Sequence, residues 1–441
     1  MSSDVDLVLQ HLKENNVFLT GGAGVGKSYT TTEIIRLYRS QTDEQIVALG
    51  STGVSAVNIG GFTIHSFFVF GISNNFEELD QNDKRSRSRL SELKKILKAT
   101  DLIIIDEISM VSSNMMEMIS YRLSSMGYLG KLLFVGDFFQ LPPVQKFGQN
   151  SNDLFGQKLY AFESDAWKSF TPIVIELTEM KRTSDAEFTH ILHKVRVGQC
   201  DQEVMNYMMR LSNSQIIDEN PTMLFGRNAE VNSTNKERLS AIEAEEHLLF
   251  ATFEEHQGRV HEKHLASWKN MLPIEEQLTL KVGVPVLFTI NKWGKYANGE
   301  RGIVHKIEED YIIIEKEEIY VRVERHDFDL LEMKSDDKGK VESIKVATLS
   351  QFPLKLAYAV TIHKSQGMSI DNLICNVDNI FAPSQFYVAI SRAINPKNLR
   401  LDFNRGNLMG YLQNMIKVDM RVVEYYTQLG QSYVTNEELP F

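Results

Sequence analysis

The chain has 441 residues, of which 43% are hydrophobic and 24% are charged, and its formal net charge is -11 at pH 7. These values suit a globular protein of two or three domains, and the lack of a long apolar run excludes a membrane-spanning chain. Two cysteines are too few for a disulfide scaffold or a zinc site, and the start of the chain lacks a secretion signal, so we expect a reducing, intracellular location. The acidic charge argues mildly against a nucleic-acid partner, although a groove can be locally basic.

The first motif lies at residues 21–28. They read Gly-Gly-Ala-Gly-Val-Gly-Lys-Ser and match the phosphate-binding pattern G-x-x-x-x-G-K-[ST], with an apolar strand before them and a helical pattern after them. Backbone N–H groups of such a loop surround a phosphate at a helix N-terminus. Lys27 is expected to reach the β- and γ-phosphates, and the Ser28 hydroxyl to bind Mg²⁺. The predicted nucleotide-contacting residues are Gly21, Gly22, Ala23, Gly24, Val25, Gly26, Lys27 and Ser28.

Apolar segments in the first part of the chain alternate with helical patterns. This alternation predicts a doubly wound α/β domain with a parallel sheet. Residues 68–98 are interpreted as a smaller insertion into it. The predicted strands are residues 17–20, 46–50, 102–106, 132–136 and 173–177.

The acidic pair Asp106-Glu107 ends the third of these strands. A carboxylate at the carboxyl end of a buried strand is well placed to hold Mg²⁺, and a second one can orient or deprotonate the attacking water. Asp106 is therefore the candidate metal ligand and Glu107 the candidate base. With the phosphate loop, the pair predicts NTP hydrolysis; the alternative is a capped loop beside an acidic surface pair.

A second set of strand patterns follows without a phosphate loop of its own. It predicts a second α/β domain, and short β-rich stretches between residues 302 and 349 predict a small antiparallel barrel inserted into it. Residues 411–426 are predicted to be a packing helix. The predicted strands of the second domain are residues 222–225, 284–290, 356–361, 373–377 and 399–403.

Three further segments are expected to close the nucleotide site. Residues 136–143 follow a buried strand, so Gln140 would lie at the carboxyl edge of the sheet, where it could sense the γ-phosphate or the hydrolytic water. Residues 361–367, Thr-Ile-His-Lys-Ser-Gln-Gly, leave a strand of the second domain. Residues 385–393, which include Arg392, precede its last strand.

On these motifs the chain resembles the superfamily 1B DNA helicases of the Pif-one family, whose sister group is RecD. The resemblance runs from the phosphate loop to Arg392 and so covers almost the whole chain. It implies an α/β fold with two RecA-like P-loop NTPase-type domains. The implied parts are residues 1–178 as domain 1A, with a wedge insertion 1B at about 68–98, residues 179–298 and 354–441 as domain 2A, and residues 299–353 as an SH3-like inserted domain 2B.

The resemblance also assigns residues around the nucleotide. Arg182 and Arg392 are implied to stabilise charge on the γ-phosphate in the transition state, and Gly367 is implied to lie close to the nucleotide. Two departures stand out: Thr183 replaces the Gln that usually follows the first arginine, and only Gln10 precedes the first strand, too close for the usual adenine-reading Gln. The motifs therefore predict NTP hydrolysis, while the Gln that selects adenine in the family has no counterpart at its usual spacing.

The DNA contacts implied by the resemblance lie at strand ends in both domains. Small hydroxyls and backbone N–H groups can hold phosphates there, while His and Phe offer stacking faces to unpaired bases. A basic run at residues 84–98 is read either as a solvated helix face or as a strand-contacting edge of the wedge. The implied DNA-binding residues are Ser51, Thr52, Gly53, Thr63, His65, Ser66 and Phe67 in the first domain and His363 and Lys364 in the second.

The resulting expectation is an ATP-dependent 5′-to-3′ DNA helicase that uses ATP and Mg²⁺ in replication, repair or recombination. Its expected partners are single-stranded DNA, junctions of single- and double-stranded DNA, and structured DNA such as G-quadruplexes, with no membrane. It is expected to work as a monomer, associated with DNA in the cytoplasm of a bacterium or of a phage-infected cell. Two alternatives remain open: a DNA-binding P-loop ATPase switch, and a RecD-like accessory subunit without unwinding activity of its own.

Overall fold

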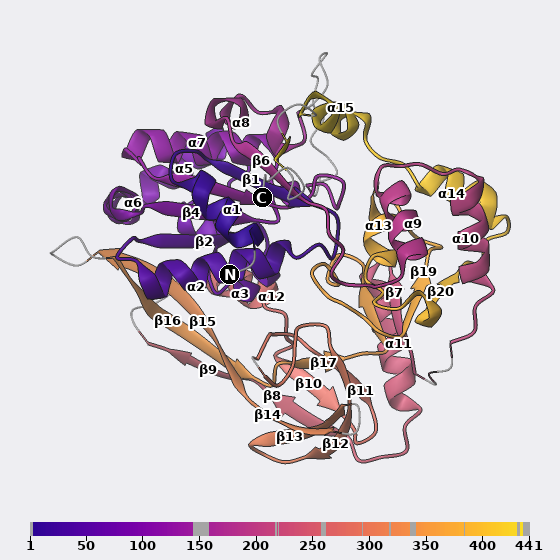
Figure 1. Cartoon of the computed structure of the whole chain (residues 1–441). Helices are drawn as coiled ribbons and strands as arrows, with labels where there is room; N and C mark the ends of the chain where they lie inside the picture. Colours follow the sequence, from indigo (N-terminus) through magenta and orange to yellow (C-terminus); the bar gives the residue numbers. More distant parts are fainter. Residues whose placement is uncertain are drawn as a thin grey trace.

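The computed structural model describes residues 3–143, 158–216, 218, 220–256, 262–292, 294–316, 319–335, 341–382, 384–429 and 433–434. Three parts are visible: a first α/β domain, a second and smaller α/β domain beside it, and a β-rich module below both (Figure 1). In the described part of the chain, no helix is long and apolar enough to cross a membrane.

The first domain contains a parallel sheet of seven strands, in the order β21-β6-β1-β5-β4-β2-β3. Alternate residues of its strands face opposite sides: Phe18 packs into one core cluster, and Val17 and Leu19 pack into another. The predicted doubly wound domain is thus confirmed. The strands are β1 (Val17–Gly21), β2 (Ile46–Gly50), β3 (Phe62–Thr63), β4 (Leu102–Asp106), β5 (Lys131–Val135), β6 (Ile173–Leu177) and β21 (Tyr433–Val434).

Helices cover both faces of this sheet (Figure 1). The predicted insertion is a helical pair, α5 (Phe76–Arg85) and α6 (Arg87–Ala99), and α6 packs against strand β15 of the β-rich module. The other helices of the domain are α1 (Ser3–Leu12), α2 (Lys27–Gln41), α3 (Gly53–Asn58), α4 (Ile64–Phe67), α7 (Ser113–Met126) and α8 (Asp165–Phe170).

The second domain is built on a parallel sheet of four strands, β18-β7-β19-β20. Its strands are β7 (Thr222–Phe225), β18 (Ala359–Thr361), β19 (Leu373–Asn376) and β20 (Leu399–Asp402). Its helices are α9 (Ala186–Arg196), α10 (Gln202–Ser212), α11 (Asn228–Ser240), α13 (Gln385–Ile390) and α14 (Leu408–Met415).

Two predicted strands of the second domain need correction. Residues 284–290 contribute β11 (Pro285–Phe288), which pairs antiparallel with two strands of the β-rich module rather than with the parallel sheet. Residues 356–361 are divided between β17 (Leu354–Leu356) in the module and β18 in the parallel sheet. Both segments are apolar and buried, so their composition does not distinguish a parallel from an antiparallel neighbour.

The β-rich module starts earlier than the inserted segment inferred from the sequence, at His247 rather than near residue 299. Its main sheet, β14-β13-β12-β11-β17, is antiparallel, and a long hairpin of β15 and β16 reaches the first domain (Figure 1). Its remaining elements are β8 (His247–Phe250), β9 (Thr252–Glu255), α12 (Glu262–Met271), β10 (Gln277–Leu280), β12 (Arg301–Ile307), β13 (Tyr311–Lys316), β14 (Ile319–Glu324), β15 (His326–Ser335) and β16 (Val341–Gln351).

The C-terminal part of the described chain returns to the first domain. Residues 411–426 do not form one helix: α14 packs in the second domain, and α15 (Met420–Leu429) packs against the first. The Tyr426 hydroxyl lies 2.8 Å from the Thr20 hydroxyl, and β21 adds the edge strand beside β6. The packing role predicted for this stretch is therefore confirmed, and its division into two helices is new.

Candidate active site between the two α/β domains

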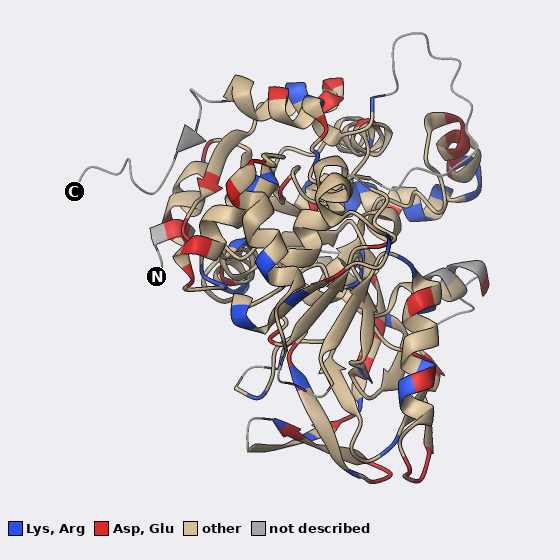
Figure 2. Ribbon diagram, turned by 90° about the vertical axis from the view of Figure 1, so that its right-hand side faces the viewer, with Lys and Arg blue, Asp and Glu red and all other residues tan. Residues whose placement is uncertain are grey.

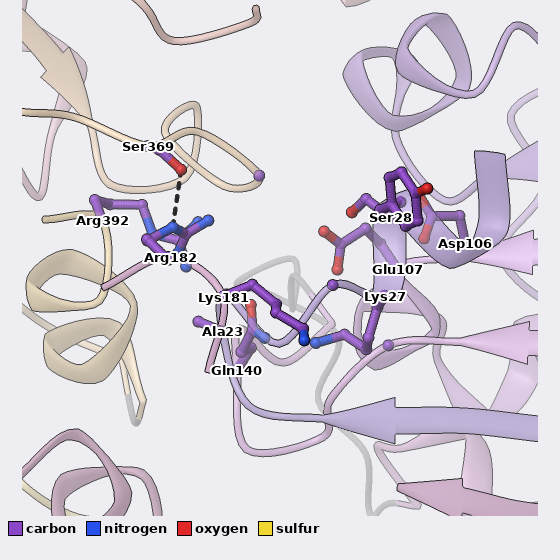
Figure 3. Close-up of a pocket in the computed structure, with 15 residues that line it drawn as sticks. Ala23, Lys27, Ser28, Asp106, Glu107, Gln140, Lys181, Arg182, Ser369 and Arg392 are labelled. Carbon is purple, nitrogen blue, oxygen red and sulfur yellow. Dashed lines mark hydrogen bonds between the residues drawn. The ribbon is translucent and has the colours of Figure 1, made fainter. Parts of the chain in front are cut away.

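A cavity of about 250 Å³ lies between the two α/β domains. Ser28, Asp106 and Glu107 lie on its first-domain side, and Arg182, Arg392 and Ser369 lie opposite them (Figure 3). The cavity thus brings together groups that lie far apart in the sequence. The complete lining is Ala23, Gly24, Gly26, Lys27, Ser28, Tyr29, Asp106, Glu107, Gly136, Gln140, Lys181, Arg182, Gly367, Ser369 and Arg392.

The phosphate loop connects β1 to α2, as its sequence predicts. Gly26 has a φ of 100° and precedes the first residue of α2, so the helix N-terminus opens into the cavity. Gly24 has a φ of 85°, and a Cβ there would lie 2.7 Å from the Cβ of Arg182. Only glycine fits both the backbone conformation and this close approach. The loop has the shape and the helix dipole that suit an anion.

Lys27 is held by its own loop. Its Nζ donates to the backbone carbonyl oxygens of Gly21 at 2.7 Å and Gly22 at 2.8 Å. Burial lowers the pKa of this ammonium group. Phosphate oxygens placed in the loop would offer Lys27 stronger, charge-assisted acceptors than these carbonyls.

The two carboxylates at the end of β4 have different environments. Asp106 accepts a hydrogen bond from the Ser55 hydroxyl at 3.1 Å and lines the same cavity as Ser28. Glu107 has a φ of 53°, a left-handed conformation that is uncommon outside glycine and is often found at functional sites. Burial, with a further effect from Asp106, raises the pKa of Glu107 to about 7. A base with a pKa near neutrality is well matched to proton transfer at physiological pH.

Gln140 belongs to a buried polar network behind the phosphate loop. Its Nε2 lies 3.3 Å from Oδ2 of Asp137, a carboxylate with no exposed surface. Arg196 of α9 donates to both Asp137 oxygens, at 3.0 and 3.1 Å, and stacks over the ring of Phe139 at 4.8 Å. Because Arg196 belongs to the second domain and Asp137 to the first, this ion pair joins the two domains directly beside Gln140. The sequence analysis missed Arg196, since an arginine at a helix end carries no distinctive signal.

Both predicted arginines line the cavity, and the second domain holds each of them. Arg182 donates to the Ser369 hydroxyl at 2.9 Å (Figure 3). It also donates to the Ser391 carbonyl oxygen at 2.6 Å. Arg392 is only 1% exposed and donates to the carbonyl oxygen of Val388 at 2.9 Å. These bonds hold the two guanidinium groups within the second domain, and oriented cationic groups of this kind suit electrostatic stabilisation of a transition state.

Two groups missed in the sequence analysis also connect the domains at this site. Gln366 donates from Nε2 to Oε2 of Glu107 at 2.9 Å, and Tyr387 accepts a hydrogen bond from the backbone N–H of Ala23 at 2.8 Å. Gln366 lies inside the 361–367 motif, whose His, Lys and Gly were assigned, so its signal was present in the sequence. Its contact places the second-domain loop directly on the candidate base.

The predicted DNA-binding residues of the first domain are mostly engaged in local structure. Thr52 and Thr63 cap α3 and α4 by accepting hydrogen bonds from the backbone N–H groups of Ser55 and Ser66. Gly53 lies against Met271 of α12, so the β-rich module covers its backbone. The buried Ser51 hydroxyl is one described polar atom without a hydrogen-bond partner.

The aromatic residues predicted to contact DNA in the first domain have different surroundings. Phe67 is 6% exposed and packs in the domain core, and it also lines a cavity of about 300 Å³ together with Ser66. His65 contacts the ring of Phe70 edge-on, at 6.3 Å between ring centres. The DNA contacts of Phe67 and His65 therefore remain predictions.

In the second domain, His363 and Lys364 follow β18 on the same loop as Gln366 and Gly367. Lys364 is exposed, and its backbone N–H donates to the Thr361 hydroxyl at 3.2 Å. Burial lowers the pKa of His363, which favours a neutral ring. One loop therefore carries both the groups assigned to DNA and those that reach the nucleotide site.

Comparisons with known proteins agree with this geometry. Residues 4–206 match the family model of PIF1-like helicases, and residues 312–423 match a further helicase model. The chain is 42% identical over 429 residues to the ATP-dependent DNA helicase Pif1 of Campylobacter jejuni, covering 94% of this chain and 95% of that protein.

Two solved structures of Pif1 helicase from Bacteroides extend the comparison to the fold. A double mutant superimposes with a TM-score of 0.83 at 25% identity and covers 98% of this chain and 97% of its own. A complex with ADP-AlF3 and single-stranded DNA gives a TM-score of 0.65 at 25% identity with the same coverage. These similarities span both α/β domains and the β-rich module, so the chain belongs to the PIF1-like helicases and is an ATP-hydrolysing DNA helicase.

Proposed function

We propose that the chain moves along single-stranded DNA in the 5′-to-3′ direction and unwinds duplex DNA at the junctions that it meets. The direction follows from the family resemblance, and the observation that carries the coupling of hydrolysis to DNA is the hydrogen bond from Gln366 of the second domain to Glu107 of the first. The loop that supplies Gln366 also supplies His363 and Lys364, so a strand held by this loop would act on the candidate base. A relative in this family has been solved with both a nucleotide analogue and single-stranded DNA.

The residues around the cavity suit different roles in ATP hydrolysis. The phosphate loop and Lys27 would bind the phosphates, and Glu107 would take a proton from the attacking water. Gln140 would orient that water, and Arg182 and Arg392 would stabilise the charge that develops on the γ-phosphate. Ser28 and Asp106 would hold Mg²⁺, which would neutralise negative charge on the phosphates. The donor set fits this ion, because a hydroxyl and a carboxylate line the same end of the cavity.

Opening and closing of the cavity would then drive movement. With ATP bound, the arginines of the second domain and the loop of the first would share one ligand and draw the domains together. After hydrolysis that shared contact is lost and the domains separate. The two domains would bind the DNA strand alternately, so that the protein moves along it.

The DNA dependence of hydrolysis tests the motor. We expect single-stranded DNA to stimulate the ATPase rate strongly, whereas a P-loop ATPase switch that binds DNA without moving along it would show little stimulation. Strand displacement from substrates with either a 5′ or a 3′ single-stranded tail tests the direction. Unwinding of only the 5′-tailed substrate is expected; stimulation without unwinding of either substrate would support the accessory-subunit alternative.

A further inference from the structure

An exposed aromatic ring lies at the mouth of the cavity between the two α/β domains. Tyr29 is the third residue of α2, follows Ser28 directly, lines the cavity and is 62% exposed. Side chains of a helix tilt towards its N-terminus, so this ring leans towards the end of α2 where phosphates would bind. The hydrolytic roles proposed above make no use of Tyr29. A flat, largely apolar face beside a phosphate site suits a nucleobase.

The polar side chains of the cavity that resemble readers of a base edge are already engaged. Recognition of adenine by its edge needs a donor and an acceptor held together, as the amide of Asn or Gln supplies. Among the lining residues in the described part of the chain, the one amide is that of Gln140, and its Nε2 lies 3.3 Å from buried Asp137. The Ser369 hydroxyl accepts a hydrogen bond from Arg182. Gln10 is exposed on α1 and is not among the residues that line the cavity.

Lys181 approaches the same end of the helix. Its Cγ lies 3.8 Å from the position of a Cβ on Gly26, the residue before α2, and its ammonium group pairs with Glu179. An ammonium group donates hydrogen bonds and accepts none. On a purine it could reach N7, an acceptor that adenine and guanine share. Lys181 therefore offers a contact without a means to choose between the two bases.

The triphosphate, by contrast, would meet a local concentration of positive charge. Lys27, Arg182 and Arg392 all line the cavity, whereas basic and acidic residues are interspersed over the α/β domains and the β-rich module (Figure 2). The net charge of -11 is a sum over the chain, so these local cations are what would attract the nucleotide. Every nucleoside triphosphate carries the same phosphates. This part of the binding energy is therefore independent of the base.

We propose that Tyr29 binds the base by stacking without edge recognition, and that the chain therefore hydrolyses GTP, CTP and UTP as well as ATP. The proposal rests on the proposed role of the phosphate loop and names the substrate class of that site. In each case water attacks the γ-phosphorus, the bond to the bridging oxygen of the β-phosphate breaks, and a nucleoside diphosphate and phosphate leave.

The physical basis is the difference between stacking and hydrogen bonding. Stacking accepts every base, because each base presents a π-face to the ring. A site that hydrogen-bonds its substrate rejects an analogue without that bond by about 10⁴-fold or more, whereas apolar contact discriminates weakly. A cavity with a stacking ring and no available amide therefore favours the phosphates over the identity of the base.

The test measures kcat/KM for ATP, GTP, CTP and UTP, and for ribose 5-triphosphate, which lacks a base, with and without a single-stranded oligothymidylate. We expect the four nucleotides to lie within about tenfold of one another. They should exceed ribose 5-triphosphate by about five-fold or more, the least that one base–aromatic stack contributes. Tyr29→Ala should lower all four to the value for ribose 5-triphosphate, whose own value should not change. Tyr29→Phe should retain the values of the unchanged protein.

Tyr121→Ala is the matched control, because that ring is also exposed, by 48%, and lies on α7 of the same domain, outside the cavity lining. Thermal unfolding of each variant checks that the fold is intact. A preference for ATP over GTP beyond about tenfold would overturn the proposal, as would an equal loss for ribose 5-triphosphate in Tyr29→Ala. Absence of DNA stimulation with every nucleotide would instead count against the proposed function, so the two failures are distinguishable.

Discussion

Each of the two α/β domains is built on a parallel sheet of its own, and the two contribute to one site in different ways. The first domain contributes mainly backbone groups to the site. Glycines shape a loop at a helix N-terminus, and Lys27 donates a hydrogen bond back to that loop. The second domain has no such loop and contributes side chains instead, with Arg182 and Arg392 oriented by hydrogen bonds to its own residues. Under the proposed function, the first domain would bind the phosphates and the second would stabilise the transition state, so catalysis would depend on the contact between the two domains.

We expect mutation of the contact between the two domains to have the largest effect. Arg196→Ala would leave Asp137 buried and without its counter-charge, and such a loss costs about 3–5 kcal/mol of stability. Chemical denaturation should therefore show a much earlier transition in this variant. Arg210→Ala, which removes an exposed pair with Glu187, is the matched control and should change the midpoint little. Similar midpoints for the two variants would mean that the domains are held together by other contacts.

In the first domain, Lys27→Ala should lower the rate of ATP hydrolysis by at least two decades, about 3 kcal/mol in the barrier. The loop backbone remains, so the protein should fold normally and lose one charge contact to the phosphates. Steady-state ATPase measurements provide the test, with Lys168→Ala, an exposed lysine on α8, as the control. Hydrolysis by Lys27→Ala within a few-fold of normal would remove the phosphate loop from the mechanism.

In the second domain, Arg392→Ala should lower turnover by about two decades, since one oriented donor to developing charge is worth about 2.7–4 kcal/mol. Nucleotide binding should decline far less, because the phosphate loop is unchanged. Binding of a fluorescent ATP analogue and turnover are measured on the same preparation. If binding and turnover fall together, the division between a binding domain and a stabilising domain does not hold.

Gln366 tests whether the second domain also acts on the base. Gln366→Ala removes the hydrogen bond to Glu107 and should slow hydrolysis by about tenfold, or about 1.4 kcal/mol. Gln366→Glu should be slower still, since it places a second carboxylate against the base. Single-turnover hydrolysis with saturating DNA distinguishes them. An equal rate in all three proteins would show that Gln366 takes no part in catalysis.

The smallest expected effect concerns Lys364. If its ammonium group contacts a DNA phosphate, Lys364→Ala should reduce the slope of log affinity against log salt by about 0.7 on single-stranded DNA. Binding isotherms at several salt concentrations measure this slope. An unchanged slope would place Lys364 outside the DNA track and leave the other loop residues to hold the strand.

Much of this organisation could be predicted from the sequence because the relevant signals are local. The phosphate loop, the strand that ends at Asp106 and the alternation of the first domain each depend on neighbouring residues, and the structure agrees on all three. The segment at 284–290 was misassigned because buried apolar strands look alike whichever sheet receives them. The same limit applies to residues 356–361, where only Ala357 and Tyr358 separate strands of two different sheets.

Which side chains meet depends on the tertiary structure. The order of residues along the chain is enough to predict the available chemistry: a phosphate loop, two carboxylates, two arginines and the segment at residues 361–367. It could not determine that Arg196 pairs with Asp137, that Gln366 reaches Glu107 or that Phe67 is buried while Tyr29 is exposed. These outcomes depend on contacts between residues far apart in the chain, whose energies are set by packing and burial rather than by local propensity.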